Sequence, residues 1–239
     1  MLGCSGTYAA PGGACSGYLV ESGGVAVLFD AGAGTLARLQ CHLPIEQLDA
    51  VVLSHSHPDH WVEMPIMRNA MRYVLHRSGL PVYSTAETLG LISAVSHEHV
   101  SPTLELHQIS DGAELTVGGL HIRCSRTDHP PETLGFRVDD GVHRFAYSAD
   151  TGPDWGFEQF GGDIDLGVCE ATFRDGVEVD SPVHMTALEA GSMARESRVR
   201  RLVITHLLPG ADAEGARAEA ESAYGAPVEL ARSGLVLDI

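Results

Sequence analysis

The stretch His55-Ser56-His57-Pro58-Asp59-His60 directly follows the apolar run Asp49-Ala50-Val51-Val52-Leu53. It places four side chains that bind metal ions in a short loop at the end of an expected β-strand. Imidazole nitrogens and a carboxylate suit a borderline divalent cation such as zinc. Four such ligands are more than one tetrahedral ion usually takes from a single loop. The motif therefore predicts two metal ions side by side.

Three further candidate ligands follow other segments with the apolar pattern of strands. They are His129 after Leu120–Arg126, Asp150 after His143–Ser148 and His206 after Leu202–Thr205. Taken singly, His129 or His206 would more often be an ordinary polar loop residue. Because functional side chains commonly lie on loops at strand ends, we expect these three to converge with the first motif at one edge of a sheet.

The length and charge of the chain limit its architecture and its partners. With 239 residues and 44% hydrophobic residues, it can bury a sizeable core, and we expect one domain over residues 1–239. The formal net charge of −17 should repel polyanions, so long nucleic acid is an unfavourable partner. A small anionic substrate is less affected, because two bound cations would dominate the local field.

The sequence also predicts where the protein is located. No apolar run approaches the roughly 20 residues of a membrane span, and the start Met1–Gly6 lacks the pattern of a secretory signal. The five cysteines are scattered and odd in number, which favours reduced thiols. We therefore expect a cytoplasmic protein without a membrane-spanning segment.

Strand-like and helix-like segments alternate along the chain, which predicts one α/β domain with mixed sheets. Hairpin signals at Ser22-Gly23-Gly24, Val117-Gly118-Gly119 and Asp139-Asp140-Gly141 argue against a purely parallel sheet. The expected strands are Tyr18–Glu21, Val25–Asp30, Asp49–Ser54, Leu104–Ile109, Leu120–Arg126, Gly135–Val138, His143–Ser148, Asp165–Glu170, Leu202–Thr205 and Gly234–Leu237. The expected helices are Thr35–Cys41, Trp61–His76, Thr85–Val95, Thr186–Glu196 and Ala213–Tyr224.

The order H-x-H-x-D-H, His, Asp, His resembles the metallo-β-lactamase superfamily, and the resemblance covers nearly the whole chain. It implies a four-layer αββα sandwich of two mixed β-sheets with a dinuclear metal site at one edge. By this resemblance the first group of ligands binds one cation and the second group binds another. A bridging carboxylate binds both cations. The first group is His55, His57 and His129, the second is Asp59, His60 and His206, and the bridge is Asp150. Zinc is the favoured metal, and manganese or iron would fit the same ligands.

The C-terminal half resembles the ribonuclease Z-type branch of that superfamily. The similar segments are Cys169-Glu170-Ala171-Thr172-Phe173, His184-Met185-Thr186-Ala187 and Val203-Ile204-Thr205-His206. This branch includes tRNA 3′-processing endonucleases and smaller phosphodiesterases, some of which act on cyclic nucleotides. The resemblance implies three catalytic residues. His184 would face the scissile phosphate, Glu170 would fix the tautomer of its imidazole, and Asp59 would orient or deprotonate the attacking water. Alternatively, His184 only supports the following helix, although Thr186 is the better capping residue by type.

Two features separate the chain from tRNA-processing members of this branch. It has no insertion corresponding to their tRNA-binding arm, and its net charge is strongly negative. We therefore favour a phosphodiesterase that hydrolyses a small diester, such as a cyclic nucleotide, through a hydroxide shared by two cations. A tRNA 3′-processing endoribonuclease, a lactone or thioester hydrolase and a non-catalytic metal-binding protein remain alternatives. Members of the branch are often homodimers, so a homodimer is also expected.

The glycine-rich start invites comparison with a phosphate-binding loop. Residues 3–17 contain five glycines but lack the lysine and hydroxyl of the G-x-x-x-x-G-K-[ST] motif. Only Met1-Leu2 precede Gly3-Cys4-Ser5-Gly6, whereas members of the branch usually begin with a full strand. We interpret the glycines as turn residues.

Overall fold

The computed structural model describes residues 1–96, 98–176 and 183–239. Its strands form one sheet of five and one of seven. The first sheet has the order β1-β2-β3-β4-β5, with β1 Tyr18–Ser22, β2 Val25–Phe29, β3 Ala50–Val52, β4 Leu80–Ser84 and β5 Leu104–Gln108. The second has the order β12-β11-β10-β9-β8-β7-β6, with β6 Glu114–Val117, β7 Leu120–Arg126, β8 Leu134–Asp139, β9 Arg144–Tyr147, β10 Leu166–Glu170, β11 Arg201–Thr205 and β12 Val228–Leu230.

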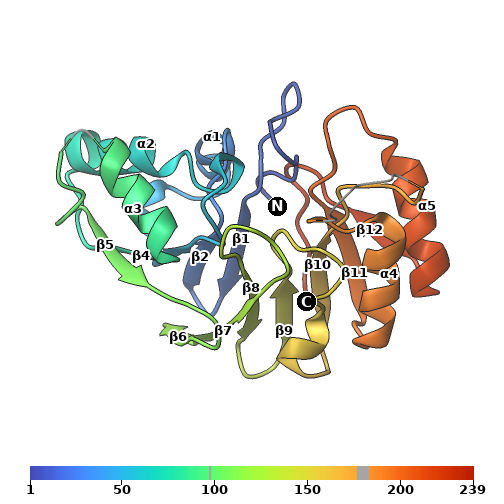
Figure 1. Cartoon of the computed structure of the whole chain (residues 1–239). Coiled ribbons are helices and arrows are strands. Elements are labelled where there is room, and N and C mark those ends of the chain that lie inside the picture. The colour runs from blue at the N-terminus through green and yellow to red at the C-terminus, as the bar shows by residue number, and fades with distance from the viewer. Residues whose placement is uncertain (97, 177–182) are drawn as a thin grey trace.

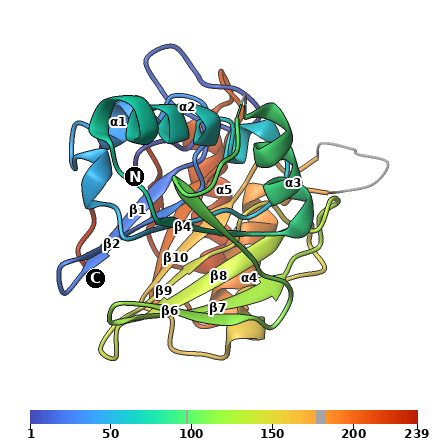
Figure 2. The same ribbon diagram turned by 90° about the vertical axis from the view of Figure 1, so that its left-hand side faces the viewer.

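Helices cover the outer faces of both sheets (Figure 1). Those beside the first sheet are α1 Thr35–Leu39, α2 Met64–Asn69 and α3 Ala86–Val95, and Figure 2 shows them on its outer face. Those beside the second sheet are α4 Ala187–Glu196 and α5 Ala213–Tyr224. Short 3₁₀ turns are η1 Ile45–Gln47, η2 Pro58–His60 and η4 Phe157–Phe160, and a π-helical segment is η3 Ala70–Leu75.

Side chains that alternate along buried strands account for this layering. On β2, Val27 and Phe29 face the second sheet, whereas Leu28 packs among the residues of α1 and α2. On β11, Val203 faces the first sheet, whereas Leu202 and Ile204 pack against α4 and α5. Both β2 and β11 thus bury side chains on both faces, as strands in sheets covered on both sides require. The expected αββα sandwich of two mixed sheets is confirmed.

The strand directions bring several loops to one edge of the sandwich. In the first sheet β2, β3 and β4 run parallel. In the second, β9, β10 and β11 run parallel, and β7 has the same direction because two antiparallel pairings separate it from β9. The loops that follow β7, β9 and β11 therefore leave the second sheet at the same end. The predicted ligands lie in these loops and in the one after β3.

The structure corrects two predicted elements. The helix expected over Trp61–His76 begins only at Met64, because Pro65 has no N–H to continue helical bonding back to Trp61, and it gives way to the π-helical η3. The strand expected over Gly234–Leu237 is absent from the described chain. Apart from Leu235 N–H, which bonds to Arg232 in a local turn, the backbone hydrogen bonds of this segment among the described residues go to Met1, through Gly234 N–H and Leu235 C=O. No neighbouring strand is therefore present to extend a ladder.

Three short strands were not expected from the sequence. In β4, Pro81 interrupts the apolar pattern, although the strand still pairs along its length with β5. Strands β6 and β12 are only four and three residues long, too short for a periodic signal. All three hairpin signals are confirmed, since β1–β2, β6–β7 and β8–β9 are antiparallel neighbours.

No helix in the described part of the chain is long and apolar enough to span a membrane. All five cysteines lie in described segments, and each is a free thiol.

Two helix-interior glycines should respond oppositely to substitution by alanine. A Cβ at Gly191 of α4 would lie 2.3 Å from the carbonyl oxygen of Ala220 on α5, whereas a Cβ at the exposed Gly90 of α3 would meet nothing within 4 Å. We expect Gly191→Ala to lower the free energy of unfolding by about 1–3 kcal/mol through overpacking. Gly90→Ala should raise it by about 0.5–1 kcal/mol, because alanine is the better helix former. Urea denaturation of both variants measures these changes, and equal effects would contradict the close packing of α4 on α5.

Candidate metal centre

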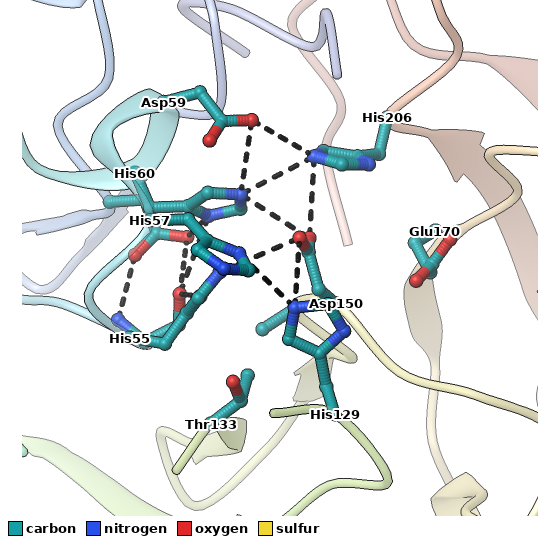
Figure 3. Close-up of polar contacts among 12 residues, drawn as sticks. His55, His57, Asp59, His60, His129, Thr133, Asp150, Glu170 and His206 are labelled. Carbon is teal, nitrogen blue, oxygen red and sulfur yellow. Dashed lines mark hydrogen bonds and ion pairs between the residues drawn. The ribbon is translucent and has the colours of Figure 1, made fainter. Parts of the chain in front are cut away.

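All seven predicted ligands lie together at one edge of the sandwich, although they come from four separate loops. Residues His55, His57, Asp59 and His60 come from the segment after β3, including η2, and His129, Asp150 and His206 follow β7, β9 and β11. In Figure 3 the carboxylate of Asp150 lies between two groups of side chains. One contains His55, His57 and His129, and the other contains Asp59, His60 and His206.

The first group presents three imidazoles to one oxygen of the central carboxylate. His129 Nε2 lies 3.2 Å from His57 Nδ1. Asp150 Oδ2 lies 3.5 Å from His55 Nε2 and 3.9 Å from His129 Nε2. His55 Nε2 is buried and has no hydrogen-bond partner among the described residues. These four ligand atoms could hold one metal ion.

The second group is more closely spaced. His60 Nε2 and His206 Nε2 are 3.3 Å apart, and each lies 3.3 Å from Asp150 Oδ1. Asp59 Oδ2 lies 3.3 Å from His206 Nε2 and 3.6 Å from His60 Nε2. Ligands at about 2.0–2.1 Å from a tetrahedral zinc ion are about 3.3 Å apart, so this spacing suits that coordination.

Hydrogen bonds on the far side of the rings leave lone pairs in this group facing one another. His60 Nδ1 lies 2.7 Å from Asp30 Oδ2, so it carries a proton that it donates to this carboxylate. His206 Nδ1 lies 2.9 Å from the hydroxyl oxygen of Thr172, whose own hydrogen is donated to Glu170 Oε2, so this nitrogen also donates. The Nε2 atoms are then acceptors that face carboxylate oxygens. Acceptors converging without a donor require a cation, which the ligand set fits.

The first group is oriented in the same way. His129 Nδ1 donates to the backbone oxygen of Val183 at 2.6 Å, and His55 Nδ1 lies 3.0 Å from Ser54 Oγ. Ser54 Oγ donates its own hydrogen to Asp30, so it accepts from His55. Their Nε2 atoms are thereby directed at the site as neutral ligands.

The residues that orient the ligands were not predicted from the sequence. Asp30 follows β2, the strand beside β3, and its side chain accepts hydrogen bonds from Ser54, His60 and Tyr147. Its place at a strand end before Ala31-Gly32 was a usable signal, because the other candidate acids and histidines also follow strands. Thr172 and Val183 carried no comparable signal, since their contacts depend on tertiary packing.

The glycine-rich N-terminal loop holds Asp59 in place. The backbone N–H of Thr7 donates to Asp59 Oδ2 at 2.7 Å. A Cβ at Gly32 would lie 1.8 Å from the carbonyl oxygen of Asp59, and one at Gly6 would lie 2.6 Å from that of His206. Glycine at positions 6 and 32 therefore permits close backbone contact beside the ligands.

Burial and charge set the protonation of the cluster. Burial lowers the pKa of His55, His57 and His129, which favours the neutral imidazoles that bind metal. Burial also acts to lower the pKa of His60, but the carboxylates of Asp150 and Asp30 outweigh it and raise the pKa well above its usual range. A proton on His60 therefore occupies the acceptor cluster when no cation is bound.

This protonation predicts that zinc binding weakens as the pH falls. A zinc ion in the second group must displace the proton on His60, whose pKa is raised, so binding should release protons around neutral pH. Affinity should therefore rise with pH until that proton is lost in the free protein. Calorimetric zinc titrations at pH 6, 7 and 8, each in two buffers of different ionisation enthalpy, measure both affinity and proton release. A pH-independent affinity would be the contrary result.

His184 and Glu170 lie beside the two ligand groups. His184 Nδ1 is 2.8 Å from Glu170 Oε1, and this carboxylate is fixed by the N–H groups of Thr151 and Thr172. The His184 ring lies 4.9 Å from that of His129 and 5.5 Å from that of His206, measured between centroids. Its side chain is 18% exposed, and it shares partial burial with the ligand His57, whereas the other six ligands are buried. His184 is therefore an imidazole outside the two ligand groups that a substrate at this edge can reach.

Comparison with known proteins identifies the class. Residues 26–207 match the family model described as Beta-lactamase superfamily domain, so the chain belongs to this superfamily, and the predicted membership is confirmed. The chain is 31% identical over 240 residues to the probable metallo-hydrolase YhfI of Bacillus subtilis, with 99% of this chain and 97% of YhfI covered. It is 27% identical to a ribonuclease Z of Methanopyrus kandleri, with 100% of this chain and 96% of that protein covered.

Solved structures show the same fold. The crystal structure of YhfI superimposes with a TM-score of 0.89 and 31% identity, covering 98% of this chain and 95% of that one. The short form of human tRNase Z superimposes with a TM-score of 0.78 at 20% identity, covering 99% and 97%, and at this identity it supports the fold alone. The chain is thus a hydrolase-class member of the superfamily, with a His/Asp cluster suited to metal ions.

Proposed function

We propose that this chain is a dinuclear metal-dependent phosphodiesterase that hydrolyses a small phosphodiester, such as a cyclic nucleotide. The observation that carries the proposal is the His184–Glu170 pair, with its 2.8 Å contact, placed beside two complete ligand groups that share Asp150. Each ligand group offers at least three ligand atoms without His184, although His184 also lies close enough to Asp150 and His206 to share a cation with them. An oriented histidine beside a metal pair suits a reaction in which a leaving oxygen must be stabilised or protonated.

The metal ligands, Asp59 and His184 would have different roles in this reaction. When bound, two divalent cations would lower the pKa of water and neutralise charge on phosphoryl oxygens. Asp59 is held by the N–H of Thr7, with Oδ2 facing the site, so it can accept a hydrogen bond or proton from the attacking water. Because Nδ1 of His184 is hydrogen-bonded to Glu170, the other ring nitrogen, Nε2, is free to donate a proton to the leaving oxygen.

The protonation of His184 suits this part. Burial acts to lower its pKa, but the hydrogen bond and charge of Glu170, with a smaller contribution from Asp150, outweigh burial and raise the pKa. Bound cations would neutralise the charge of Asp150, but the hydrogen bond that His184 Nδ1 donates to Glu170 would remain. Glu170 therefore favours an imidazolium that can donate a proton.

The charge of the chain supports a small substrate rather than a polynucleotide. The net charge is −17, and the loop after β10 adds little positive field because Arg174 is paired with Asp212 and Glu219. We propose zinc as the resident metal on the basis of the His-rich ligand set. A homodimer and a cytoplasmic location are further parts of the proposal, based on the family resemblance and the scattered free cysteines.

A tRNA 3′-processing activity is the second candidate, because curated sequence relatives over the full chain include proteins described as ribonuclease Z. The two functions differ in what the surface must bind. A tRNA-processing enzyme neutralises many phosphates, so its substrate affinity depends steeply on salt concentration. A small diester needs only the metal ligands and His184 at the edge of the sandwich.

The test is hydrolysis by the zinc-reconstituted protein of cyclic AMP, bis-p-nitrophenyl phosphate and a 3′-extended tRNA precursor. We expect turnover of both small diesters and no specific tRNA cleavage. Site-specific tRNA cleavage would instead assign the chain to tRNA processing. Inactivity on all three, with activity on a lactone or thioester, would replace the phosphodiesterase proposal.

A further inference from the structure

Two buried tyrosines connect the sheets directly behind the second ligand group. Tyr147 of β9 donates its phenolic hydrogen across the sandwich to Asp30 Oδ2, at 2.8 Å. Tyr18 of β1 shares a 2.6 Å hydrogen bond with Thr205 Oγ1 of β11. The two rings touch, with centroids 4.6 Å apart and planes at 51°. One bond thus joins a phenol of the second sheet to the first sheet, and the other joins a phenol of the first sheet to the second.

Each of these bonds leads to a ligand of the second group. The oxygen of Asp30 that accepts from Tyr147 also accepts from His60 Nδ1, at 2.7 Å. Thr205 immediately precedes His206, and Asp150 lies three residues after Tyr147, in the loop that follows β9. The ligands of this group come from both sheets, so their spacing depends on how the sheets are held together.

We propose that Tyr147 and Tyr18 are positioning residues that hold the two sheets at the spacing required by the second cation, Tyr147 through Asp30 and His60, and Tyr18 through Thr205 and His206. The inference rests on the two-metal part of the proposed function and is independent of the substrate.

Removal of the phenolic hydroxyl should weaken binding of the second cation more than binding of the first. In the first group, His129 is oriented by the backbone of Val183. His55 reaches Asp30 only through Ser54, one hydrogen bond further than His60 does. In the second group, Asp30 Oδ2 accepts from three donors, namely Ser54 Oγ, His60 Nδ1 and Tyr147. Without the phenol, this buried carboxylate loses a donor, and its contact with His60 must adjust.

Both phenols are suited to permanent hydrogen bonds, with Tyr147 as a donor. Burial, followed by the charge of Asp30, raises the pKa of Tyr147 well above its usual value, and burial raises that of Tyr18 likewise. Both hydroxyl groups therefore keep their hydrogen at neutral pH. Phenylalanine keeps the ring contact and removes only the hydrogen bond, which makes it the informative substitution.

The experiment compares Tyr147→Phe and Tyr18→Phe with Tyr224→Phe in the full chain. Tyr224 is a matched control, since its buried hydroxyl donates to the backbone oxygen of Val199 at 2.7 Å within the α5 layer. Stepwise zinc affinities are measured with a competing chelator, and bound zinc is counted by elemental analysis. Asp59→Ala, which removes a second-group ligand, identifies the binding step that belongs to this group.

We expect Tyr147→Phe to weaken that step by about 10–100-fold and to weaken the other step much less, because His55 is linked to Asp30 only through Ser54. Tyr18→Phe should weaken the same step, and Tyr224→Phe should weaken neither. Unchanged zinc affinity in Tyr147→Phe, or equal weakening of both steps, would overturn the inference. A parent protein that binds two zinc ions but hydrolyses no diester would contradict the proposed function and leave this inference intact.

Discussion

Replacing Asp150 by alanine should abolish the dinuclear centre and with it all metal-dependent hydrolysis. Its Oδ1 lies 3.3 Å from His60 Nε2 and from His206 Nε2, and its Oδ2 lies 3.5 Å from His55 Nε2. It is the residue that belongs to both ligand groups. Loss of a residue that only hydrogen-bonds to a metal ligand lowers metal affinity by about 10–100-fold. Loss of this shared ligand should therefore lower the affinity for each of the two cations by more.

Thermal unfolding with and without zinc measures this effect independently of any substrate. Free zinc at 100 times its dissociation constant stabilises a folded protein by about 2.7 kcal/mol. The parent should therefore melt at a higher temperature with zinc, and Asp150→Ala should not. Asp154→Ala, which removes an exposed carboxylate from the same loop, should respond like the parent. Two tightly bound zinc ions in Asp150→Ala would disprove the bridging role.

The substitution His184→Ala should lower kcat for cyclic AMP by about 10²–10⁴-fold, the range typical of general acid catalysis. Both zinc ions should remain bound, because the groups His55/His57/His129/Asp150 and Asp59/His60/His206 are formed without His184. As the acid form is required, the rate of the parent should fall as the pH rises through the raised pKa of His184. This decline should be absent from the variant.

The leaving group separates proton donation from general charge stabilisation. p-Nitrophenolate needs little protonation, whereas the leaving ribose oxygen of cyclic AMP does. His184→Ala should therefore slow bis-p-nitrophenyl phosphate hydrolysis much less than cyclic AMP hydrolysis. His143→Ala, in the exposed β8–β9 turn, is the control and should affect neither. Equal losses on both substrates would indicate stabilisation of phosphoryl charge, and no loss would leave His184 a structural residue.

Side-chain periodicity accounts for the elements that the sequence predicted well. Helix α5 occupies the expected Ala213–Tyr224, and β7 occupies the expected Leu120–Arg126, because both have regular patterns and clear end signals. The start of α2 was wrong because Pro65 outweighs the apolar spacing of the preceding residues. The expected strand Gly234–Leu237 was wrong because an apolar run forms a strand only where a neighbour can pair with it.

The sequence by itself determined the chemical identity of the site. His55, His57, Asp59 and His60 follow one strand so closely that their convergence is a local property of the chain, and the same residue types after β7, β9 and β11 point to the same edge. Only the tertiary structure decided how these ligands are held. Asp30, Thr172 and Tyr147 act across sheets or loops, through single hydrogen bonds to partners as far apart as Tyr147 and Asp30 in sequence. Such contacts depend on the distance between packed layers, and no local pattern of residues encodes that distance.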